Sequence, residues 1–400
     1  MKNIGLKASR VKQIAFTFFF LFITSSVQAQ TDSIQARLNS LMQDPLLERT
    51  QLGLMVYDLT ADRTIYSYGA RQTLRPASTM KLLTAVTALD LLGGDYLYRT
   101  SLHYTGEVRN RVLIGDIYCV GGMDPMFDEE DMNSFVRSIL ALGIDSIHGR
   151  LVSVTSFKEE NLWGEGWCWD DDNPQLTPLL VTRKNEFLDR LSEKLRRSGV
   201  RLFNAPYATE ALPKNALNLG TRFRPLKDIL VPMLKESDNL YAESMFFQIA
   251  AQMGPRPAKA VHARQLIKAT LGKAGVANIE YRIADGSGLS LYNYVTPELM
   301  VKLLVYAYRK PAIIQHLYSA LPIAGEDGTL KKRMLKTPAK GRVRAKTGTL
   351  EGISSLAGYC PTAEGHMLAF CIINQGVMKN TDGREFQDKL CTILCKSWKR

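Results

Sequence analysis

Apolar residues dominate two short runs, 52–60 and 64–68, on either side of a polar turn, and this predicts two β-strands. After Ser78 the spacing changes, and apolar residues recur every three or four positions until Gly93-Gly94. Such spacing is typical of a helix, and paired glycines commonly end one. We therefore expect Ser78 in the first turn of a buried helix.

The same patterns predict a helical pair and a group of strands farther along the chain. Helical spacing covers residues 226–235, breaks, and resumes over 240–252, so residues 237–239 are expected at a helix–loop–helix junction. Three strands and then a terminal helix are predicted near the C-terminus. The strands span residues 342–349, 353–359 and 366–374.

Strands from both ends of the chain are expected to share one antiparallel sheet flanked by helices. Residues 97–222 differ from the rest, because they consist of short apolar runs, turns and loop-like clusters. We interpret them as an insertion. The predicted fold class is α/β (α+β), with a main domain formed by residues 30–96 and 223–400 and a smaller inserted domain, residues 97–222.

The N-terminus has the pattern of an export signal. Its first 29 residues carry four basic and no acidic side chains, an apolar run from Ile14 to Thr24, and Val27-Gln28-Ala29 before the expected cleavage point. The apolar run is shorter than the roughly 20 residues that span a bilayer. We interpret residues 1–29 as a cleavable signal peptide and expect a periplasmic protein, although an uncleaved anchor stays open.

Charge and cysteine content narrow the classes of partner. The formal net charge is +12, and removal of residues 1–29 lowers it to about +8. The charge is scattered, so nucleic acid is not an expected partner, whereas peripheral contact with a membrane surface stays open. Six cysteines without a C-x-x-C pair favour small apolar fillers over metal or redox chemistry. Only Cys360 and Cys371, on either side of a predicted turn, form a pair worth testing for a disulfide.

Three short motifs follow one another along the chain, and together they indicate one site. Each alone has a structural explanation, because serines often cap helices and a lysine often ends a solvated strand. Their order and local context point instead to chemistry. They are the S-x-x-K motif (Ser78 to Lys81), the S-D-N motif (Ser237 to Asn239) and the K-T-G motif (Lys346 to Gly348).

A serine hydroxyl needs a base to become a nucleophile, and the five histidines lie outside every motif. Lys81 is the expected base, since residues three apart are neighbours on a helix. A free lysine has a pKa of about 10.4, so this pKa must be lowered substantially. Burial and a nearby cation have that effect, and Lys346 is the expected cation.

The other motif residues suit binding of a carboxylate-terminated peptide. The backbone N–H groups of Ser78 and Thr349 are expected to stabilise an oxyanion. Gly348 lets a substrate approach the strand closely. The side chains of Lys346 and Thr347, with the Thr349 hydroxyl, suit a terminal carboxylate.

The S-D-N motif completes this set. Ser237 is expected to relay a proton toward the leaving amine, and the two-sided amide of Asn239 suits a substrate amide. The predicted catalytic residues are therefore Ser78, Lys81, Ser237, Asn239 and Lys346. No metal and no cofactor are expected.

With these motifs, the chain resembles the D-alanyl-D-alanine carboxypeptidase/endopeptidase family of low-molecular-mass (class C) penicillin-binding proteins. The resemblance runs from about residue 50 to the C-terminus. It includes the stretches Gly115 to Tyr118, Gly121 to Pro125, Lys235 to Glu243 and Asp285 to Ser290.

This resemblance implies a serine β-lactamase/transpeptidase-like fold and an acyl-enzyme on Ser78. It also implies peptidoglycan stem peptides as substrates and β-lactams as covalent inhibitors. The family usually continues the Asp285 to Ser290 stretch with arginine, whereas this chain has Leu291. The resemblance implies that Asp171, or its neighbour Asp170 or Asp172, binds the charged end of the substrate side chain. The interval between the first two motifs is short for the family, so one inserted subdomain is expected to be absent.

Two competing functions remain at this stage. A serine β-lactamase shares the three motifs but needs a carboxylate or an activated water for deacylation. Glu243 is the acid near the S-D-N motif, and its helical pattern favours packing or a surface position. A non-catalytic peptidoglycan-binding or sensing module would keep the fold and lose the chemistry. The oligomeric state is left open.

Overall fold

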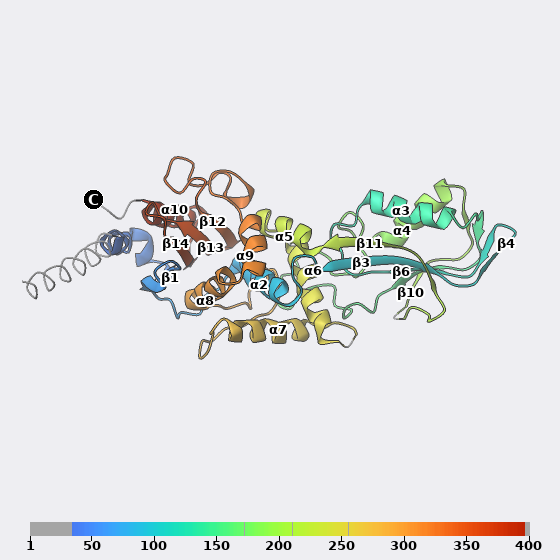
Figure 1. Cartoon of the computed structure of the whole chain (residues 1–400), viewed down its shortest axis with the longest axis horizontal. Coiled ribbons are helices and arrows are strands. Elements are labelled where there is room, and N and C mark those ends of the chain that lie inside the picture. The colour runs from blue at the N-terminus through green and yellow to red at the C-terminus, as the bar shows by residue number, and fades with distance from the viewer. Residues whose placement is uncertain (1–33, 172, 210, 255, 397–400) are drawn as a thin grey trace, which may run out of the picture.

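The computed structural model describes residues 34–171, 173–209, 211–254 and 256–396. The predicted signal peptide, residues 1–29, lies outside these residues. The molecule is elongated, with a helix-covered sheet at one end, a strand-rich region at the other, and helices between them (Figure 1). Among the described residues, none of the helices has the length and apolar content needed to cross a membrane.

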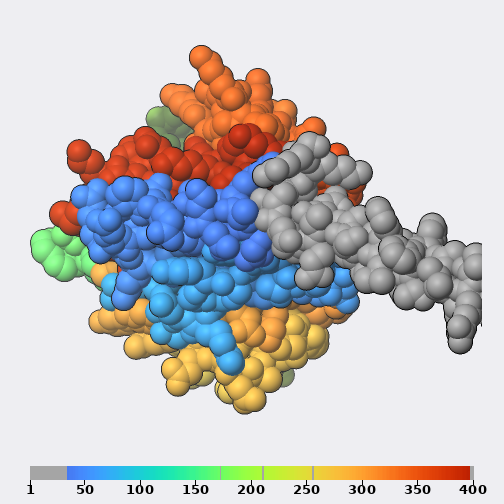
Figure 2. All heavy atoms as spheres, turned by 90° about the vertical axis from the view of Figure 1, so that its left-hand side faces the viewer, coloured from blue at the N-terminus to red at the C-terminus, as the bar shows by residue number. Residues whose placement is uncertain are grey.

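The first sheet joins both ends of the chain, as predicted. Its strands are antiparallel and lie in the order β12-β13-β14-β1-β2. In the register between β1 and β14, Leu54 faces Ile372. Figure 2 shows the N-terminal segment (blue) packed against the C-terminal one (red). The strands are β1 (Gln51–Asp58), β2 (Arg63–Tyr68), β12 (Arg344–Leu350), β13 (Ile353–Pro361) and β14 (Met367–Gln375).

Helices cover both faces of this sheet, which explains why all but the last residue of β13 are buried. On one face, Leu356 and Cys360 pack in a cluster with Phe386 and Leu390 of α10 (Asn380–Cys395). On the other, Tyr359 donates a hydrogen bond to the Leu304 carbonyl of α8 (Pro297–Tyr308) at 2.9 Å.

A bundle of helices connects the sheet to the strand-rich region (Figure 1). Helix α2 lies inside it and has no polar face, since every residue from Lys81 to Leu89 is buried. The predicted helical pair appears as α5 and α6. The helices are α2 (Lys81–Leu91), α5 (Leu226–Lys235), α6 (Asn239–Ala250), α7 (Ala260–Lys273) and α9 (Pro311–Ala320), with short 3₁₀ turns η1 (Pro45–Glu48), η2 (Ala77–Met80), η3 (Ala251–Met253) and η4 (Gly328–Leu330).

In the described part of the chain between Leu97 and Pro225, nine strands form two further sheets. One has the order β10-β8-β6-β3-β11 and the other β4-β5-β7-β9. They are β3 (Leu97–Tyr104), β4 (Glu107–Arg109), β5 (Val112–Ile114), β6 (Ile117–Val120), β7 (Ser146–Ile147), β8 (Leu151–Val154), β9 (Arg201–Leu202), β10 (Tyr207–Thr209) and β11 (Leu217–Pro225), with α3 (Glu129–Leu140) and α4 (Phe187–Arg197) packed on them.

We propose that residues 97–222 form an inserted domain. This region has its own apolar cluster, in which the Phe127 ring lies 5.4 Å from Phe135 and 5.0 Å from Phe187. Strand β11 continues past residue 222 to Pro225, so its last residues lead directly into α5. The insertion is thus joined to the helical bundle at the start of α5, the helix that ends just before the S-D-N motif.

Cys360 and Cys371, the pair worth testing for a disulfide, do not face each other. Across β13 and β14, Cys371 faces Ala357 whereas Cys360 faces Leu368, so the two thiols lie on opposite faces of the sheet. The Cys360 sulfur instead lies 3.1 Å from the sulfur of Cys395 at the end of α10. All six cysteines are free thiols.

Candidate active site

Ser78 lies on the 3₁₀ turn η2, which runs straight into α2. The expected first turn of the helix is therefore tighter than an α-helical turn. The preceding residue, Ala77, has a φ of +48°, a conformation that costs a non-glycine residue on the order of 1–3 kcal/mol. Its surroundings hold it there: a side chain at Gly288 would come within 2.0 Å of the Ala77 carbonyl oxygen. Tight packing fixes the backbone that presents the Ser78 hydroxyl.

Lys81 is completely buried and contacts two of the three motifs. Its Nζ lies 3.0 Å from Ser78 Oγ and donates hydrogen bonds to Asn239 Oδ1 at 2.7 Å and to the Ser287 carbonyl at 2.8 Å. The amine is thereby fixed against the hydroxyl, in the geometry that a general base requires.

Burial lowers the pKa of Lys81 to about 8. The carboxylates of Asp285, Glu243 and Asp238 act in the opposite direction, because they favour the charged amine. A substantial fraction of Lys81 is therefore neutral near physiological pH, as a proton acceptor must be.

Lys346 connects the K-T-G motif to the S-D-N motif. Its buried Nζ donates to Ser237 Oγ at 2.8 Å and to the Thr347 carbonyl at 2.7 Å. Burial, together with the neighbouring Lys81 cation, holds the pKa of Lys346 well below the usual lysine value. The effect runs in one direction, because Lys81 lowers the pKa of Lys346, whereas burial, and not the expected Lys346 cation, lowers the pKa of Lys81.

The S-D-N motif forms the predicted helix–loop–helix junction between α5 and α6. Ser237 has a φ of +63°, and the next residue, Asp238, caps α6 by accepting hydrogen bonds from the N–H groups of Leu240 at 3.0 Å and Tyr241 at 3.4 Å. The cap fixes the start of the helix and with it Asn239, whose side chain contacts Lys81.

Strand β12 brings the K-T-G motif against the turn that carries Ser78. It is an edge strand, so one side of its backbone is not paired within the sheet. Thr347 donates its hydroxyl to Thr329 at 2.8 Å, and Thr349 is exposed. The three motifs therefore meet at one place, as the sequence predicts.

Gly348 is the closest point of this contact, and we predict that Gly348→Ala slows penicillin acylation by roughly tenfold or more. An added methyl group would lie 2.2 Å from Ser355 Oγ, 2.6 Å from the Pro76 carbonyl and 3.0 Å from the Ser78 nitrogen. Relief of this overlap costs about 1–3 kcal/mol and moves β12 away from Ser78. The rate of fluorescent-penicillin labelling measures the effect.

Gly272→Ala is the matched control for this variant. Gly272 lies in α7, and an added methyl group there meets nothing within 4 Å. We expect unchanged labelling in this control. Wild-type labelling in Gly348→Ala would show that the contact between strand and turn does not limit acylation.

The loop from Asp285 to Ser290 supports the base. The Asp285 carboxylate accepts hydrogen bonds from the N–H groups of Gly288 at 2.8 Å and Ser290 at 2.7 Å, and from the indole of Trp167 at 2.8 Å. These bonds fix the loop whose Ser287 carbonyl accepts from Lys81.

Glu243 was expected at a packing or surface position. It is buried, and its carboxylate supports the backbone of the loop from Asp285 to Ser290. One of its carboxylate oxygens accepts from the N–H groups of Gly286 at 3.0 Å and Ser287 at 2.7 Å. Burial, with Asp285 nearby, raises the pKa of Glu243 to about 8. The sequence analysis did not predict this contact between Glu243 and the loop. The glycine-rich stretch 285–290 did indicate a turn, and the backbone N–H groups of a turn require hydrogen-bond acceptors.

Among the described residues, the Asp171 side chain forms no hydrogen bond or ion pair with any of the three motifs. It is exposed, as is Asp170, whereas Asp172 lies outside the described residues. Its loop nevertheless reaches the site, because Trp167 bonds to Asp285. The backbone carbonyl of Leu291, the residue that departs from the family pattern, accepts from Arg75 Nε at 2.9 Å.

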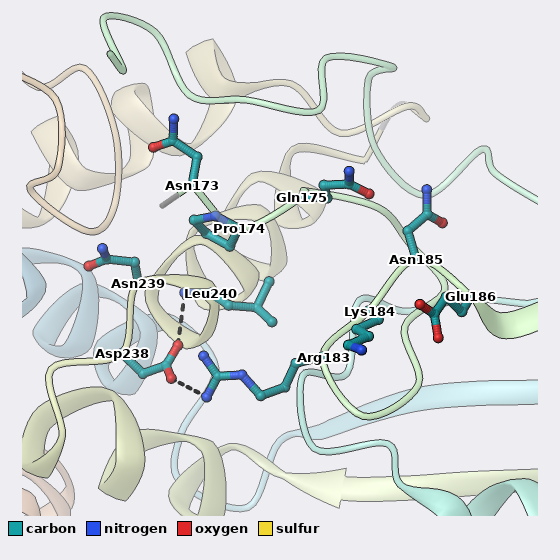
Figure 3. Close-up of a pocket in the computed structure, with 10 residues that line it drawn as sticks. All are labelled: Asn173, Pro174, Gln175, Arg183, Lys184, Asn185, Glu186, Asp238, Asn239 and Leu240. Carbon is teal, nitrogen blue, oxygen red and sulfur yellow. Dashed lines mark hydrogen bonds and ion pairs between the residues drawn. The ribbon is translucent and has the colours of Figure 1, made fainter. Parts of the chain in front are cut away.

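A cavity of about 650 Å³ opens beside the S-D-N motif (Figure 3). Asp238, Asn239 and Leu240 form its wall on the side of α6. The opposite walls come from residues 173–175 and 183–186 of the proposed inserted domain. The site thus has room for a ligand where the two parts of the molecule meet.

The model of the D-Ala-D-Ala carboxypeptidase 3 (S13) family matches residues 34–178 and 175–397. A D-alanyl-D-alanine carboxypeptidase from Actinomadura sp. (strain R39) is 28% identical, over 87% of this chain and 82% of that protein. D-alanyl-D-alanine carboxypeptidase DacB from Haemophilus influenzae is 27% identical, over 81% of this chain and 85% of that protein.

Solved structures agree with these sequence relationships. Penicillin binding protein 4 (dacB) from Haemophilus influenzae superposes with a TM-score of 0.82 at 25% identity, covering 90% of this chain and 99% of that one. The same protein complexed with a β-lactam superposes with a TM-score of 0.76 at 26% identity, with the same coverage of both chains. Fold class and family agree with those expected from the sequence. The chain belongs to the D-Ala-D-Ala carboxypeptidase 3 (S13) family.

Proposed function

We propose that the protein removes the terminal D-alanine from D-alanyl-D-alanine peptides of peptidoglycan, or cleaves D-alanyl cross-links, through an acyl-enzyme on Ser78. The observation that carries this proposal is the contact of 3.0 Å between the buried amine of Lys81 and the Ser78 hydroxyl. Family membership supports the same reaction.

In the acylation step, Ser78 Oγ attacks the carbonyl carbon between the two D-alanines while Lys81 accepts the hydroxyl proton. The oxyanion that forms is stabilised by the N–H groups of Ser78 and Thr349. The C–N bond then breaks, and the leaving amine receives a proton from Lys81 through Ser237. Ser237 suits this relay because it accepts a hydrogen bond from Lys346 at 2.8 Å. Water then releases the acyl group.

The remaining residues hold the substrate. Lys346, Thr347 and Thr349 bind the terminal carboxylate, and Gly348 lets the peptide lie along the open side of β12. Asn239 holds the amide before the scissile bond. We keep Asp171 as the residue that meets an amine on the substrate side chain, because Trp167, in the same loop, contacts Asp285.

The competing β-lactamase function requires a carboxylate that activates water. Glu243 does not suit this role, because one of its oxygens already accepts two backbone N–H groups and the side chain is 1% exposed. A long-lived penicillin adduct is therefore expected, which makes β-lactams covalent inhibitors of the protein.

We further infer export to the periplasm, from the signal pattern in residues 1–29. Peripheral contact with anionic lipid headgroups suits the segment 331–344, which carries seven basic and no acidic residues. The segment is richer in charge than the scattered distribution expected from the sequence. Among its side chains, Lys331, Lys332 and Lys336 are exposed.

Incubation with penicillin followed by peptide mass spectrometry tests the function. We expect a stable adduct on the peptide that contains Ser78, together with release of D-alanine from a peptide ending in D-alanyl-D-alanine. No adduct on the wild-type protein would support a non-catalytic binding module instead. Rapid turnover of nitrocefin would support a β-lactamase.

A further inference from the structure

The cavity beside Asn239 is continuous with the proposed catalytic residues. Asn239 lines it and also accepts a hydrogen bond from Lys81 at 2.7 Å. The far walls come from two segments of the proposed inserted domain, 173–175 and 183–186 (Figure 3). A group bound in this cavity would therefore lie next to the acyl-donor part of a substrate.

A strained turn presents two cations to this cavity. Val181 and Lys184 exchange backbone hydrogen bonds of 3.1 and 2.9 Å across Thr182 and Arg183, which have φ values of +46° and +70°. Turns with two left-handed residues favour asparagine and glycine, and a β-branched threonine is especially disfavoured there. Such strain is commonly kept where function requires it.

Arg183 has its charge neutralised within the protein. Its guanidinium forms an ion pair with Asp238, the cap of α6, and lies over the Tyr241 ring at 5.7 Å. Figure 3 shows this ion pair at the floor of the cavity. Arg183 thereby ties the turn to the S-D-N motif.

Lys184 has no such partner. Among the described residues, none forms a hydrogen bond or ion pair with its ammonium group, and the side chain is exposed. The acid in the same segment, Glu186, accepts a hydrogen bond from Arg190 at 3.3 Å. Of the two cations that line the cavity, Lys184 is therefore the one that is left free, among the described residues, to pair with an anionic ligand.

We propose that this cavity is a subsite for the acyl-donor peptide, in which Lys184 binds a carboxylate located before the scissile D-alanyl bond. The inference rests on the proposed function, because it places the acyl donor at Asn239. Lys184 is then a specificity-determining residue, which selects substrates by charge without taking part in bond cleavage.

Three synthetic pentapeptides ending in D-alanyl-D-alanine test this subsite. The first has a free carboxylate on a D-glutamyl residue and lysine as its third residue, and the second has that carboxylate amidated. The third has the D-glutamyl group amidated and a free carboxylate on the third residue. The peptide that the wild type prefers identifies the source of the bound carboxylate.

We expect wild-type kcat/KM to be about tenfold higher for one of the carboxylate peptides than for the amidated peptide, mainly through KM, as a charge-assisted hydrogen bond predicts. Lys184→Gln should abolish the preference and Lys184→Glu should reverse it. Lys214→Gln, an exposed lysine that does not line the cavity, is the matched control and should keep it. An unchanged preference in Lys184→Gln would overturn the inference.

Penicillin labelling of Ser78 separates this inference from the proposed function. Labelling should be the same in wild type and Lys184→Gln, because the small β-lactam does not need the subsite. If the wild type releases no D-alanine from any peptide, the proposed function fails. The subsite is then measured by competition, in which the carboxylate peptide should slow labelling of the wild type about tenfold more effectively than labelling of Lys184→Gln. If the carboxylate peptide slowed labelling of both proteins equally, the inference that Lys184 forms this subsite would be overturned.

Discussion

Ser78→Ala is expected to abolish penicillin labelling and to lower D-alanine release by about 10⁴-fold or more, since loss of a serine nucleophile has effects of this size. The variant removes one oxygen atom from a side chain that is only partly buried. Lys81 keeps its hydrogen bonds to Asn239 and Ser287. The unfolding temperature should therefore change by no more than about 2 °C. Labelling, product release and thermal unfolding are measured on the same preparation.

Ser319→Ala is the matched control for this prediction. Ser319 is exposed on α9, and its hydroxyl donates only to backbone carbonyls of its own helix, those of Gln315 and His316, both at 3.0 Å. Labelling and release should be unchanged in that variant. D-alanine release that persists in Ser78→Ala at the wild-type rate would mean that another residue is the nucleophile.

Lys81→Ala is expected to lower the acylation rate by about 10²- to 10⁴-fold, the usual contribution of a positioned base. Binding of penicillin before acylation should weaken much less, because Lys81 lies behind Ser78 and is completely buried. Stopped-flow labelling at several penicillin concentrations separates the dissociation constant of the initial penicillin complex from the rate constant of acylation. Equal loss of binding and rate would show that Lys81 has another role.

The pH dependence of acylation follows from the pKa of Lys81. This pKa is lowered to about 8 by burial, and the neutral amine is the reactive form. The acylation rate should therefore rise as the pH increases through about 8 and then level off. Glu243, whose pKa is raised to about 8, titrates in the same range, so the inflection belongs to the coupled pair.

Lys81→Arg provides the control for the pH profile. Arginine keeps a positive charge at all accessible pH values and cannot accept the proton. The variant should acylate as slowly as Lys81→Ala, without a rise near pH 8. A rise that persists in Lys81→Arg would assign the titration to a different group.

The sequence predicted the main sheet and the meeting of the motifs because the signals were strong and local. The strands at both ends are rich in apolar residues, and helical spacing stops at a glycine pair or at a polar capping segment. The S-D-N junction was predictable for the same reason, since Asp238 follows the end of one helical pattern and begins the next.

The supporting contacts could not be predicted, because they depend on distant parts of the chain. In the sequence, Glu243 is one polar residue in a largely apolar helical segment, and its partners become visible only when the stretch 285–290 folds over it. The left-handed backbone of Ala77 depends on packing against Gly288. That Cys360 and Cys371 cannot form a disulfide is visible only in the register of β13 and β14, because strand alternation places them on opposite faces of the sheet.

The joining of both chain ends in one sheet has a consequence for the timing of activity. The strand with the K-T-G motif is synthesised after the segments that carry Ser78 and the S-D-N motif, and it pairs with β13 and, through β14, with β1. A growing polypeptide that ends before residue 349 lacks the proposed oxyanion donor Thr349. We therefore do not expect such a chain to trim the wall, even though it already contains Ser78 and Lys81.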